Sequence, residues 1–424
     1  MSRQPRIHCL IPLVLALCVA QAEAAEPTLP DPLMLSDVVA IARSGRAEVS
    51  AANARAEAAA QRPAIVSALE DPMISASVDH YPYSPPMMEG GKRYDRSFTV
   101  EQKFPLSRVR THRRESANAE AVRARALAAS TELDVVLDAQ RNFLMLHERR
   151  RMKVVIDEQI SLAQQLVSAA ANRYASGSGM QADVLRAEVE VARVKAEQQA
   201  LAAQIRAAEA MLNVSVGRPA QATVPALQYT PNREEPVSEF MVLDRAFSHR
   251  PELSAGAAEV NRAIAETEVM RTMYKPMLMV RIGQARTMAE GAGAMLMIGV
   301  SVPLWRERLD AGVAEAQAMH RMADADLESM RRMVTGEAIV AREKVNAVRS
   351  QLHALASEVL PRALAATDSA LAGYASGKGT LVAVIESARA LWSVQAELVM
   401  VESSIGEAWA RLDRAMGTVQ EATP

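Results

Sequence analysis

Methionine is the residue type in this sequence whose chemistry points most directly to a ligand. The chain has 23 methionines, and many of them stand two or three positions apart. Thioether sulfur is a soft ligand that suits Cu(I) or Ag(I), although methionine also fills irregular gaps between helices and strands. No Met-His-Met motif accompanies the pairs, which favours gap filling. The weak candidates for metal ligands are Met277, Met279, Met295 and Met297.

The residues that build catalytic sites show no pattern that predicts an enzyme. Six of the seven histidines follow residue 24, and none of them has the His-Glu-x-x-His spacing of a zinc site. No nucleophile elbow, phosphate-binding loop or paired carboxylate motif can be placed at a strand end. The 48 basic and 50 acidic residues give a net charge of -2, which argues against nucleic-acid binding. We therefore expect no catalytic residue, no cofactor and no nucleic-acid partner.

The first 24 residues have the layout of a secretory signal peptide. A short basic start is followed by an apolar run at 9–20 and by Ala-Glu-Ala at 22–24, the small-x-small pattern that precedes cleavage. Cys9 and Cys18 are the only cysteines, so a chain cut after residue 24 has no thiol for a disulfide, for catalysis or for a metal. Lipidation of Cys18 is the alternative, although the residue before it is larger than is usual at an acylation site.

A seven-residue turn occurs twice, and the two copies organise the chain. Residues 173–179 read Arg-Tyr-Ala-Ser-Gly-Ser-Gly, and residues 373–379 read Gly-Tyr-Ala-Ser-Gly-Lys-Gly. Matching residues continue at the same spacing as far as Gly217 and Gly417, which indicates an internal duplication. Each turn lies between long helical stretches, so each is predicted to be the tip of a helical hairpin. The tip residues are Ser176, Gly177, Ser178 and Gly179 in the first copy, and Ser376, Gly377, Lys378 and Gly379 in the second.

The same order of elements is therefore expected twice after the signal peptide. Segments with period-two alternation of apolar and polar residues predict strands, and long stretches without Gly or Pro predict helices. The predicted fold is mainly α, with long coiled-coil hairpins and four β-strands in each chain. The expected boundaries are 25–217 for the first repeat (strand pair 73–104, hairpin 106–217), 218–238 for a proline-rich connector, 239–417 for the second repeat (strand pair 277–302, hairpin 304–417) and 418–424 for a tail.

The predicted strands are about nine residues long, which is the length that crosses a bilayer in a tilted strand. Four strands cannot close into a barrel, and open sheet edges are not tolerated in lipid. A membrane role therefore requires oligomerisation, with eight strands from two copies or twelve from three. If Leu278 and Ile298 face lipid in such a barrel, the four candidate methionines face its lumen. The alternative is a small soluble sheet that packs against the helices.

This plan resembles the TolC family of outer-membrane efflux channels over essentially the whole mature chain. The resemblance rests on the duplicated helix, strand pair and hairpin, on Pro105 and Pro303 after the strands, and on the Tyr-Ala-Ser-Gly tips. Its most specific elements are the segments that follow the tips, 182–187 and 382–387, and the compact loops look most like the heavy-metal branch of CzcC- and CusC-like proteins. The resemblance implies a homotrimer with a twelve-stranded barrel in the outer membrane and an α-helical tunnel in the periplasm. It also implies docking through the tips onto a periplasmic adaptor protein and an inner-membrane RND pump.

The resemblance further implies a gate near the second tip. Tyr374 matches a gate tyrosine, Glu386 matches a carboxylate of a ring in the tunnel, and Asp183 matches an acid of the first copy that takes part in closure. Threefold symmetry would bring three Glu386 side chains together, and their field would favour cations. The alternative is that Glu386 and Asp183 are ordinary solvated charges on helices.

Two positions depart from the family pattern of this gate. Ala383 and Gly379 stand where a second acid and a gate arginine are expected. Closure is therefore expected to depend on fewer contacts, or on other residues such as Lys378 or Arg389.

The second hairpin is predicted to move most, because it alone contains Gly and Pro residues that permit bending. The overall prediction is a passive exit duct for heavy-metal cations. The alternatives are a duct for drugs or other organic solutes and, without a channel, a periplasmic coiled-coil scaffold. The bending residues are Gly312, Gly336, Pro361 and Gly373.

Overall fold

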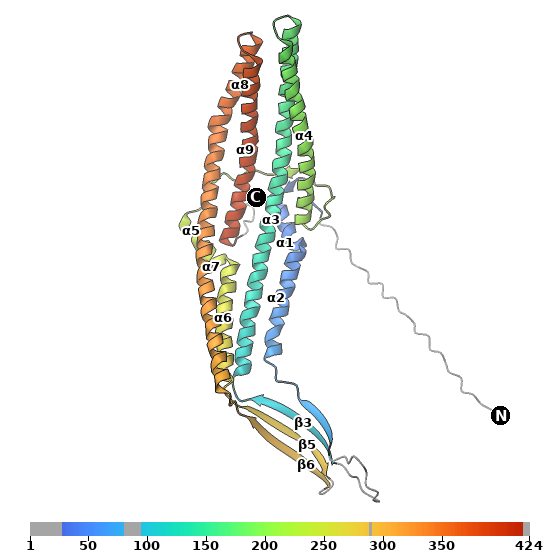
Figure 1. Cartoon of the computed structure of the whole chain (residues 1–424), viewed down its shortest axis with the longest axis vertical. Coiled ribbons are helices and arrows are strands. Elements are labelled where there is room, and N and C mark those ends of the chain that lie inside the picture. The colour runs from blue at the N-terminus through green and yellow to red at the C-terminus, as the bar shows by residue number, and fades with distance from the viewer. Residues whose placement is uncertain (1–27, 80–94, 288–290, 419–424) are drawn as a thin grey trace, which may run out of the picture.

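Long helices run from a four-stranded sheet at one end of the molecule to two hairpin turns at the other (Figure 1). The computed structural model describes residues 28–79, 95–287 and 291–418. The predicted signal peptide with its two cysteines, the Pro- and Gly-rich segment at 80–91 and most of the predicted tail lie outside the described residues. The helices are α1 (Leu35–Gly45), α2 (Ala47–Val66), α3 (Val109–Ala175), α4 (Gln181–Ser215), α5 (Glu239–His249), α6 (Pro251–Thr272), α7 (Arg306–Ala354), α8 (Leu360–Ala375) and α9 (Leu381–Met416).

The helix that opens each repeat is broken after its first 11 residues, where the sequence had predicted one continuous helix. Arg46 separates α1 from α2, and Arg250 separates α5 from α6, each with an extended backbone. Pro251 explains the second break, because a proline disfavours the helical conformation of the residue before it and is well tolerated at the first helical position. In the first repeat the break follows Gly45, which ends α1. The two breaks lie at equivalent points and allow each helix to change direction about halfway along the molecule.

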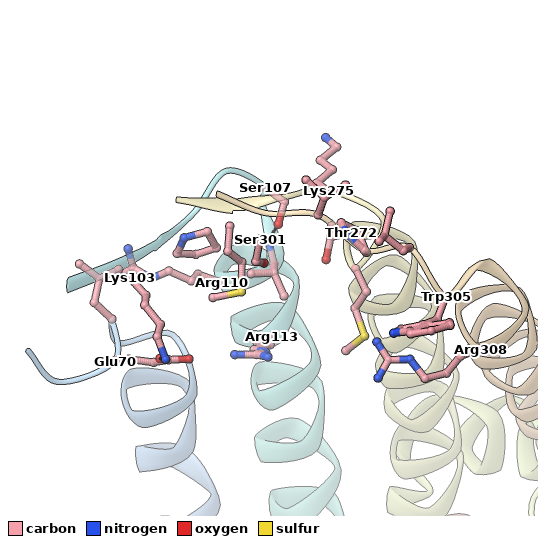
Figure 2. Close-up of a pocket in the computed structure, with 18 of the residues that line it drawn as sticks. Glu70, Lys103, Ser107, Arg110, Arg113, Thr272, Lys275, Ser301, Trp305 and Arg308 are labelled. Atoms are coloured by element: carbon pink, nitrogen blue, oxygen red, sulfur yellow. Dashed lines mark hydrogen bonds and ion pairs between the residues drawn. The ribbon is translucent and has the colours of Figure 1, made fainter. Parts of the chain in front are cut away.

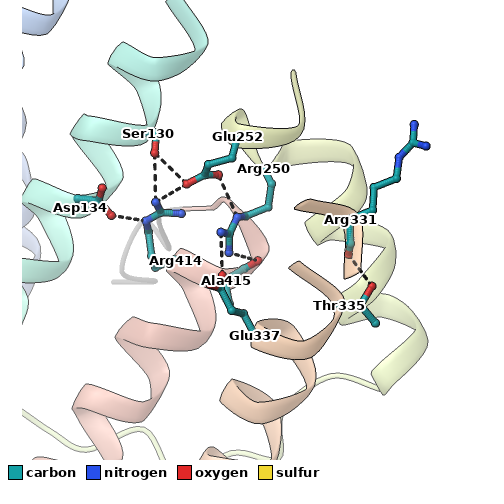
Figure 3. Close-up of polar contacts among 9 residues, drawn as sticks. All are labelled: Ser130, Asp134, Arg250, Glu252, Arg331, Thr335, Glu337, Arg414 and Ala415. Carbon is teal, nitrogen blue, oxygen red and sulfur yellow. Dashed lines mark hydrogen bonds and ion pairs between the residues drawn. The ribbon is translucent and has the colours of Figure 1, made fainter. Parts of the chain in front are cut away.

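A network of charged side chains joins the two repeats at the level of these breaks (Figure 3). Arg414 of α9 donates to Asp134 Oδ1 at 2.7 Å and also pairs with Glu252, which accepts from Ser130 Oγ at 2.8 Å. Arg250, which is buried, donates to Glu252 Oε2 at 3.0 Å. Burial would raise the pKa of Glu252, but its hydrogen bonds, above all the one from Arg414, lower this pKa to about 2. The network therefore holds a fully ionised carboxylate between α3 of the first repeat and α9 of the second.

The main sheet has the strand order β2-β3-β5-β6, with every neighbouring pair antiparallel. Its polar face carries Ser75 opposite Thr99, and Glu101 opposite Arg281, whose Nε donates to Glu101 Oε2 at 2.9 Å. The strands are β2 (Met73–Asp79), β3 (Asp95–Pro105), β5 (Met277–Thr287) and β6 (Gly291–Ser301).

The other face of this sheet is apolar and exposed in the single chain. The register places Val280 opposite Ile298, and Ile282 opposite Leu296. Phe98 and Leu296 on this face are 56% and 67% exposed. No part of the chain that the structure describes covers this face. Among the described residues, no helix is both long enough and apolar enough to cross a membrane.

A short parallel ladder ties the start of the described chain to the connector between the repeats. It pairs β1 (Leu33–Met34) with β4 (Leu227–Gln228). Leu33 is fully buried in an apolar cluster that also contains Phe143 and Leu212. The sequence had not predicted either strand.

The second long hairpin differs from the first by a local change of helix type. Residues Leu355–Val359 form a π-helical turn between α7 and α8, in which Leu360 N–H donates to Leu355 O, five residues back. Pro361 follows directly and has no N–H to continue the α-helical ladder, which accounts for the turn. Gly312 and Gly336 lie inside α7 without interrupting it. Pro361 and Gly373 lie in α8, and of the four predicted bending points only Pro361 adjoins a departure from regular α-helix.

Candidate functional site

The two repeated turns have the same backbone geometry. Ser176 and Ser376 are the C-cap residues of α3 and α8, and the next residues, Gly177 and Gly377, have φ angles of 71° and 77°. This left-handed conformation is unfavourable for residues with a Cβ, which explains the glycine at both positions. The eight predicted tip residues lie at the end of the molecule far from the sheet (Figure 1).

The second glycine of each turn is favoured by close packing rather than by its backbone angles. A Cβ on Gly179 would lie 3.0 Å from Cβ of Arg173, and a Cβ on Gly379 would lie 3.1 Å from the backbone of Gly373. Among the eight tip residues, the exposed side chains are small except for Lys378, which replaces Ser178 of the first copy. The tips therefore present mainly backbone and hydroxyl groups, with one positive charge on the second copy.

Arg173 of the first hairpin binds the end of the second hairpin. Its Nη1 donates to the backbone oxygen of Tyr374 at 2.6 Å, and its guanidinium lies 4.6 Å from the centre of the Tyr374 ring. Its Nη2 also donates to Ser178 O at 3.1 Å, within its own turn. One side chain thus orders its own turn and holds the neighbouring tip by a hydrogen bond and a cation–π contact.

Tyr174 and Tyr374 stand at the same position of the two repeated turns but lie in different environments. Tyr374 is 3% exposed, whereas Tyr174 is 51% exposed. Burial raises the pKa of Tyr374, and the negative charge of Asp183 raises it further. Its hydroxyl has no hydrogen-bond partner among the described residues. Tyr374 therefore acts as an apolar anchor between the hairpins, near Asp183 but without a hydrogen bond to it.

An apolar cluster continues this contact below the tips. It draws on α3 and α4 of the first hairpin and on α8 and α9 of the second. Burial of such side chains contributes about 25 cal/mol for each Å² removed from water. Its buried members are Leu166, Ala170, Ala187, Tyr374, Leu381, Val384 and Ile385.

An ion pair between the hairpins lies further along the same helices. Glu190 of α4 is 4% exposed at its side chain, and it accepts from Arg389 Nε of α9 at 3.1 Å and from Arg193 Nε at 3.2 Å. Burial would raise the pKa of Glu190, but the hydrogen bonds and charges of the two arginines lower it overall. Arg389, suggested from the sequence as an alternative closing residue, therefore has a partner that sequence reasoning missed.

The predicted carboxylates do not form this pair. Glu386 is exposed on α9 and makes no ion pair within the described part of the chain, although its charge, after that of Glu190, raises the pKa of Arg389. Asp183 lies 3.6 Å from Arg186 Nη1, measured from its Oδ1. Within one chain, Tyr374, Asp183 and Arg389 are thus brought to the interface between the hairpins, whereas Glu386 and Lys378 point to solvent.

The four candidate methionines lie on one face of the sheet, far from the tips. Met279 is opposite Gly299, and Met297 is opposite Arg281. A Cβ on Gly299 would lie 2.8 Å from the terminal methyl of Met279, so this side chain packs over the glycine. In the described ranges, no group of three His, Cys, Asp or Glu residues is placed to hold a metal ion. The contact of Met279 with Gly299 is of the kind that gap filling predicts, and the role of the four methionines as metal ligands stays a prediction.

A comparison with protein families matches most of the chain. The model of the outer membrane efflux protein family matches residues 38–218 and 242–418. The cobalt-zinc-cadmium resistance protein CzcC of Cupriavidus metallidurans is 24% identical over 415 residues, which cover 94% of this chain and 95% of that protein. Each matched segment includes one strand pair and one hairpin, so the two segments correspond to the two repeats of the chain.

Solved structures of outer-membrane proteins share this fold. CusC superposes with a TM-score of 0.80 at 13% identity, covering 91% of this chain and 92% of CusC. The outer-membrane channel OprN gives 0.79 at 17% identity, covering 91% and 90%. VceC of Vibrio cholerae gives 0.77 at 17% identity, covering 91% and 96%. The mainly helical, TolC-like fold predicted from the sequence is confirmed.

Proposed function

Because this chain belongs to the outer membrane efflux protein family, we propose that it is the exit duct of a tripartite efflux system and that its cargo is heavy-metal cations. The duct spans the outer membrane and extends into the periplasm. Its role is passage and gating, as in the channel proteins that share its fold, and the pump supplies the energy.

The observation that most directly supports this proposal is the open, four-stranded sheet. Strands β2 and β6 are the edges of the sheet, and its apolar face is exposed along its length. An apolar face requires a lipid or protein cover, and open edges cannot remain unpaired in lipid. Pairing β2 of one copy with β6 of the next closes the edges, three copies give a closed barrel of twelve strands, and lipid covers the apolar outer face. Its polar face, with Glu101 and Arg281, then lines the lumen.

The tips are the proposed contact with the rest of the system. Helix α3 has 67 residues, so it extends roughly 100 Å from the sheet at 1.5 Å per residue. This length carries the tips across the periplasm towards a periplasmic adaptor protein and an inner-membrane RND pump. The exposed serines and glycines of the turns allow close approach of another helical hairpin.

Opening is proposed to separate the second hairpin from the first. The contacts that hold them, Arg173 with Tyr374 and Glu190 with Arg389, lie within one chain, and only the second hairpin contains a π-helical turn. A cysteine pair that links the second hairpin near residue 374 to a neighbouring subunit should abolish transport. Equivalent links near residue 174 should have a smaller effect. Equal loss of transport from both links would contradict this mechanism.

The cargo is proposed from the relative whose name includes cobalt, zinc and cadmium. A deletion strain tested against a panel of metal salts and organic drugs distinguishes the possibilities. We expect hypersensitivity to one or more divalent metals, restored by the wild-type gene. Hypersensitivity to organic compounds alone would refute heavy metals as the cargo but would remain consistent with an exit duct. No phenotype, together with a soluble protein, would instead indicate a periplasmic scaffold.

A further inference from the structure

A pocket lies where the sheet meets the helices, at the end of the molecule opposite the tips (Figure 2). Its volume is about 430 Å³, which is within the range of sites that bind small molecules. Its walls are the ends of β3, β5 and β6, the first turns of α3 and α7, and the residues that follow α2 and α6. It lies apart from the candidate gate, and of the four candidate methionines only Met277 lines it.

The pocket is strongly basic although the whole chain is nearly neutral. Of the ionisable residues that line it, five are basic and Glu70 alone is acidic. Glu70 lies 3.9 Å from Lys103 Nζ, so it offsets one of the five charges in part. The acids at the start of α7, Glu307 and Asp310, do not line the pocket. The basic residues are Lys103, Arg110, Arg113, Lys275 and Arg308.

Two of these arginines are available to a ligand. Arg113 and Arg308 make no ion pair or side-chain hydrogen bond in the described ranges, whereas Arg110 Nε donates to Ser67 O at 2.7 Å. Figure 2 shows Arg113 on α3 and Arg308 on α7, both on the helix side of the sheet, whereas Lys275 extends away from them. Guanidinium groups bind phosphate and carboxylate oxygens with paired hydrogen bonds. The N-termini of α3 and α7 at this pocket add to the positive potential.

The pocket opens on the polar side of the sheet. The strand residues that line it, Lys103, Pro105, Met277 and Ser301, all belong to the polar face, and no residue of the apolar face takes part. The location of the pocket in the lumen rests on the proposed function, because this side of the sheet faces the lumen only if the chain forms the duct.

We propose that this pocket binds a soluble, multivalent oxyanion of the phosphate or carboxylate class. A bare cation is repelled here, whereas an anion gains contacts with Arg113 and Arg308 that no carboxylate of the described residues occupies. Three copies place three such pockets around the junction between barrel and tunnel. A metal ion crosses this junction more readily as an anionic complex with a polycarboxylate or phosphate than as a free cation.

Isothermal titration of the detergent-solubilised wild-type protein with inorganic pyrophosphate tests the site. We expect binding that weakens steeply with added salt, and at least a tenfold loss of affinity in the double variant Arg113→Gln/Arg308→Gln. The matched control is Arg331→Gln/Arg332→Gln, which removes two exposed arginines of α7 that pair with Glu328. Absence of binding to the wild-type protein, or equal affinity in the two double variants, overturns the proposal. Matching thermal unfolding of both variants guards against misfolding.

Two further measurements separate this site from the proposed function and from lipid binding. A protein that conducts ions in planar bilayers but does not bind pyrophosphate refutes the site and leaves the duct. A protein that binds pyrophosphate but never conducts refutes the duct and leaves the site. Binding that persists in phosphatidylcholine nanodiscs but disappears with phosphatidylglycerol would mean that lipid headgroups occupy the pocket, which contradicts a soluble ligand.

Discussion

Replacing Arg389 by glutamine should favour the open state of the duct. The substitution removes the ion pair with Glu190 that joins α9 to α4, and it leaves Arg193 as the remaining partner of that carboxylate. If the second hairpin leaves the first on opening, the pair stabilises only the closed state. The fraction of time that a single trimer conducts in a planar bilayer should therefore rise.

The burial of the two partners sets the expected size of this effect. Exposed ion pairs contribute about 0.2–1 kcal/mol, and breaking a buried pair costs about 3–5 kcal/mol. Glu190 is 4% exposed and Arg389 is 51% exposed at their side chains, so the pair belongs between these classes, at about 2 kcal/mol. Since 1.4 kcal/mol is a factor of ten in an equilibrium constant, the ratio of open to closed states should rise up to about 30-fold.

A double-mutant cycle makes the test specific. Glu190→Gln, Arg389→Gln and the combined variant should show strong coupling, with the double variant little different from either single one. Glu188→Gln is the matched control, because Glu188 is an exposed acid on the same helix. The reasoning fails if the two effects add to within about 0.5 kcal/mol, or if the control opens the duct as much as Arg389→Gln does.

The remaining predictions concern the tips and the network between the repeats. Arg173→Gln removes the hydrogen bond to Tyr374 O, which costs the closed state about 1 kcal/mol. The ratio of open to closed states should therefore rise about fivefold. An unchanged ratio in the bilayer assay would contradict a role for this contact in closure. Gly377→Ala places a Cβ on a residue with a φ of 77° and should destabilise its turn by about 1–2 kcal/mol, seen as weaker adaptor binding in a pull-down. Gly293→Ala should bind normally, because Gly293 lies in β6, far from the tips, and a Cβ there meets no atom within 4 Å. The pKa of Glu252 is lowered from 4.5 to about 2 in the folded protein. The ionised Glu252 therefore adds about 3 kcal/mol to the free energy of unfolding. This contribution is complete above pH 4.5 and is lost as the pH falls towards 2. Thermal unfolding should show this acid-induced loss in the wild-type protein and much less of it in Glu252→Gln, and parallel pH profiles would refute the assignment.

Local patterns in the sequence predicted the elements because their causes are local. Period-two alternation placed Leu278 and Ile298 on one face of the sheet and the candidate methionines on the other, as the register has them. The duplicated turn predicted two hairpins, because a positive φ angle leaves a clear signal in Gly177 and Gly377. The two-residue strands β1 and β4 were missed, because pairs this short leave no periodicity.

Contacts between residues of the two repeats could not be predicted from local sequence patterns. Arg173 and Glu190 contact the second hairpin, and their partners lie about 200 positions away in the sequence. One signal was present: Gly373 replaces Arg173 in the second copy, and Ala390 replaces Glu190. Charges that occur in only one copy of a duplicated chain are candidates for contacts between the copies, because such contacts break the equivalence of the repeats.

The central claim is that neighbouring copies close the sheet through β2 and β6, and cysteine crosslinking in the native outer membrane tests it most directly. No cysteine follows residue 18, so introduced pairs report without background. A cysteine at Ala76 in β2, combined in turn with cysteines at Leu296, Ile298 and Val300 in β6, samples the register of the edges on the apolar face. For at least one pair, disulfide formation should give a ladder of bands that ends at the covalent trimer. Only monomers from every pair, or a protein recovered from the soluble periplasmic fraction, would contradict the account.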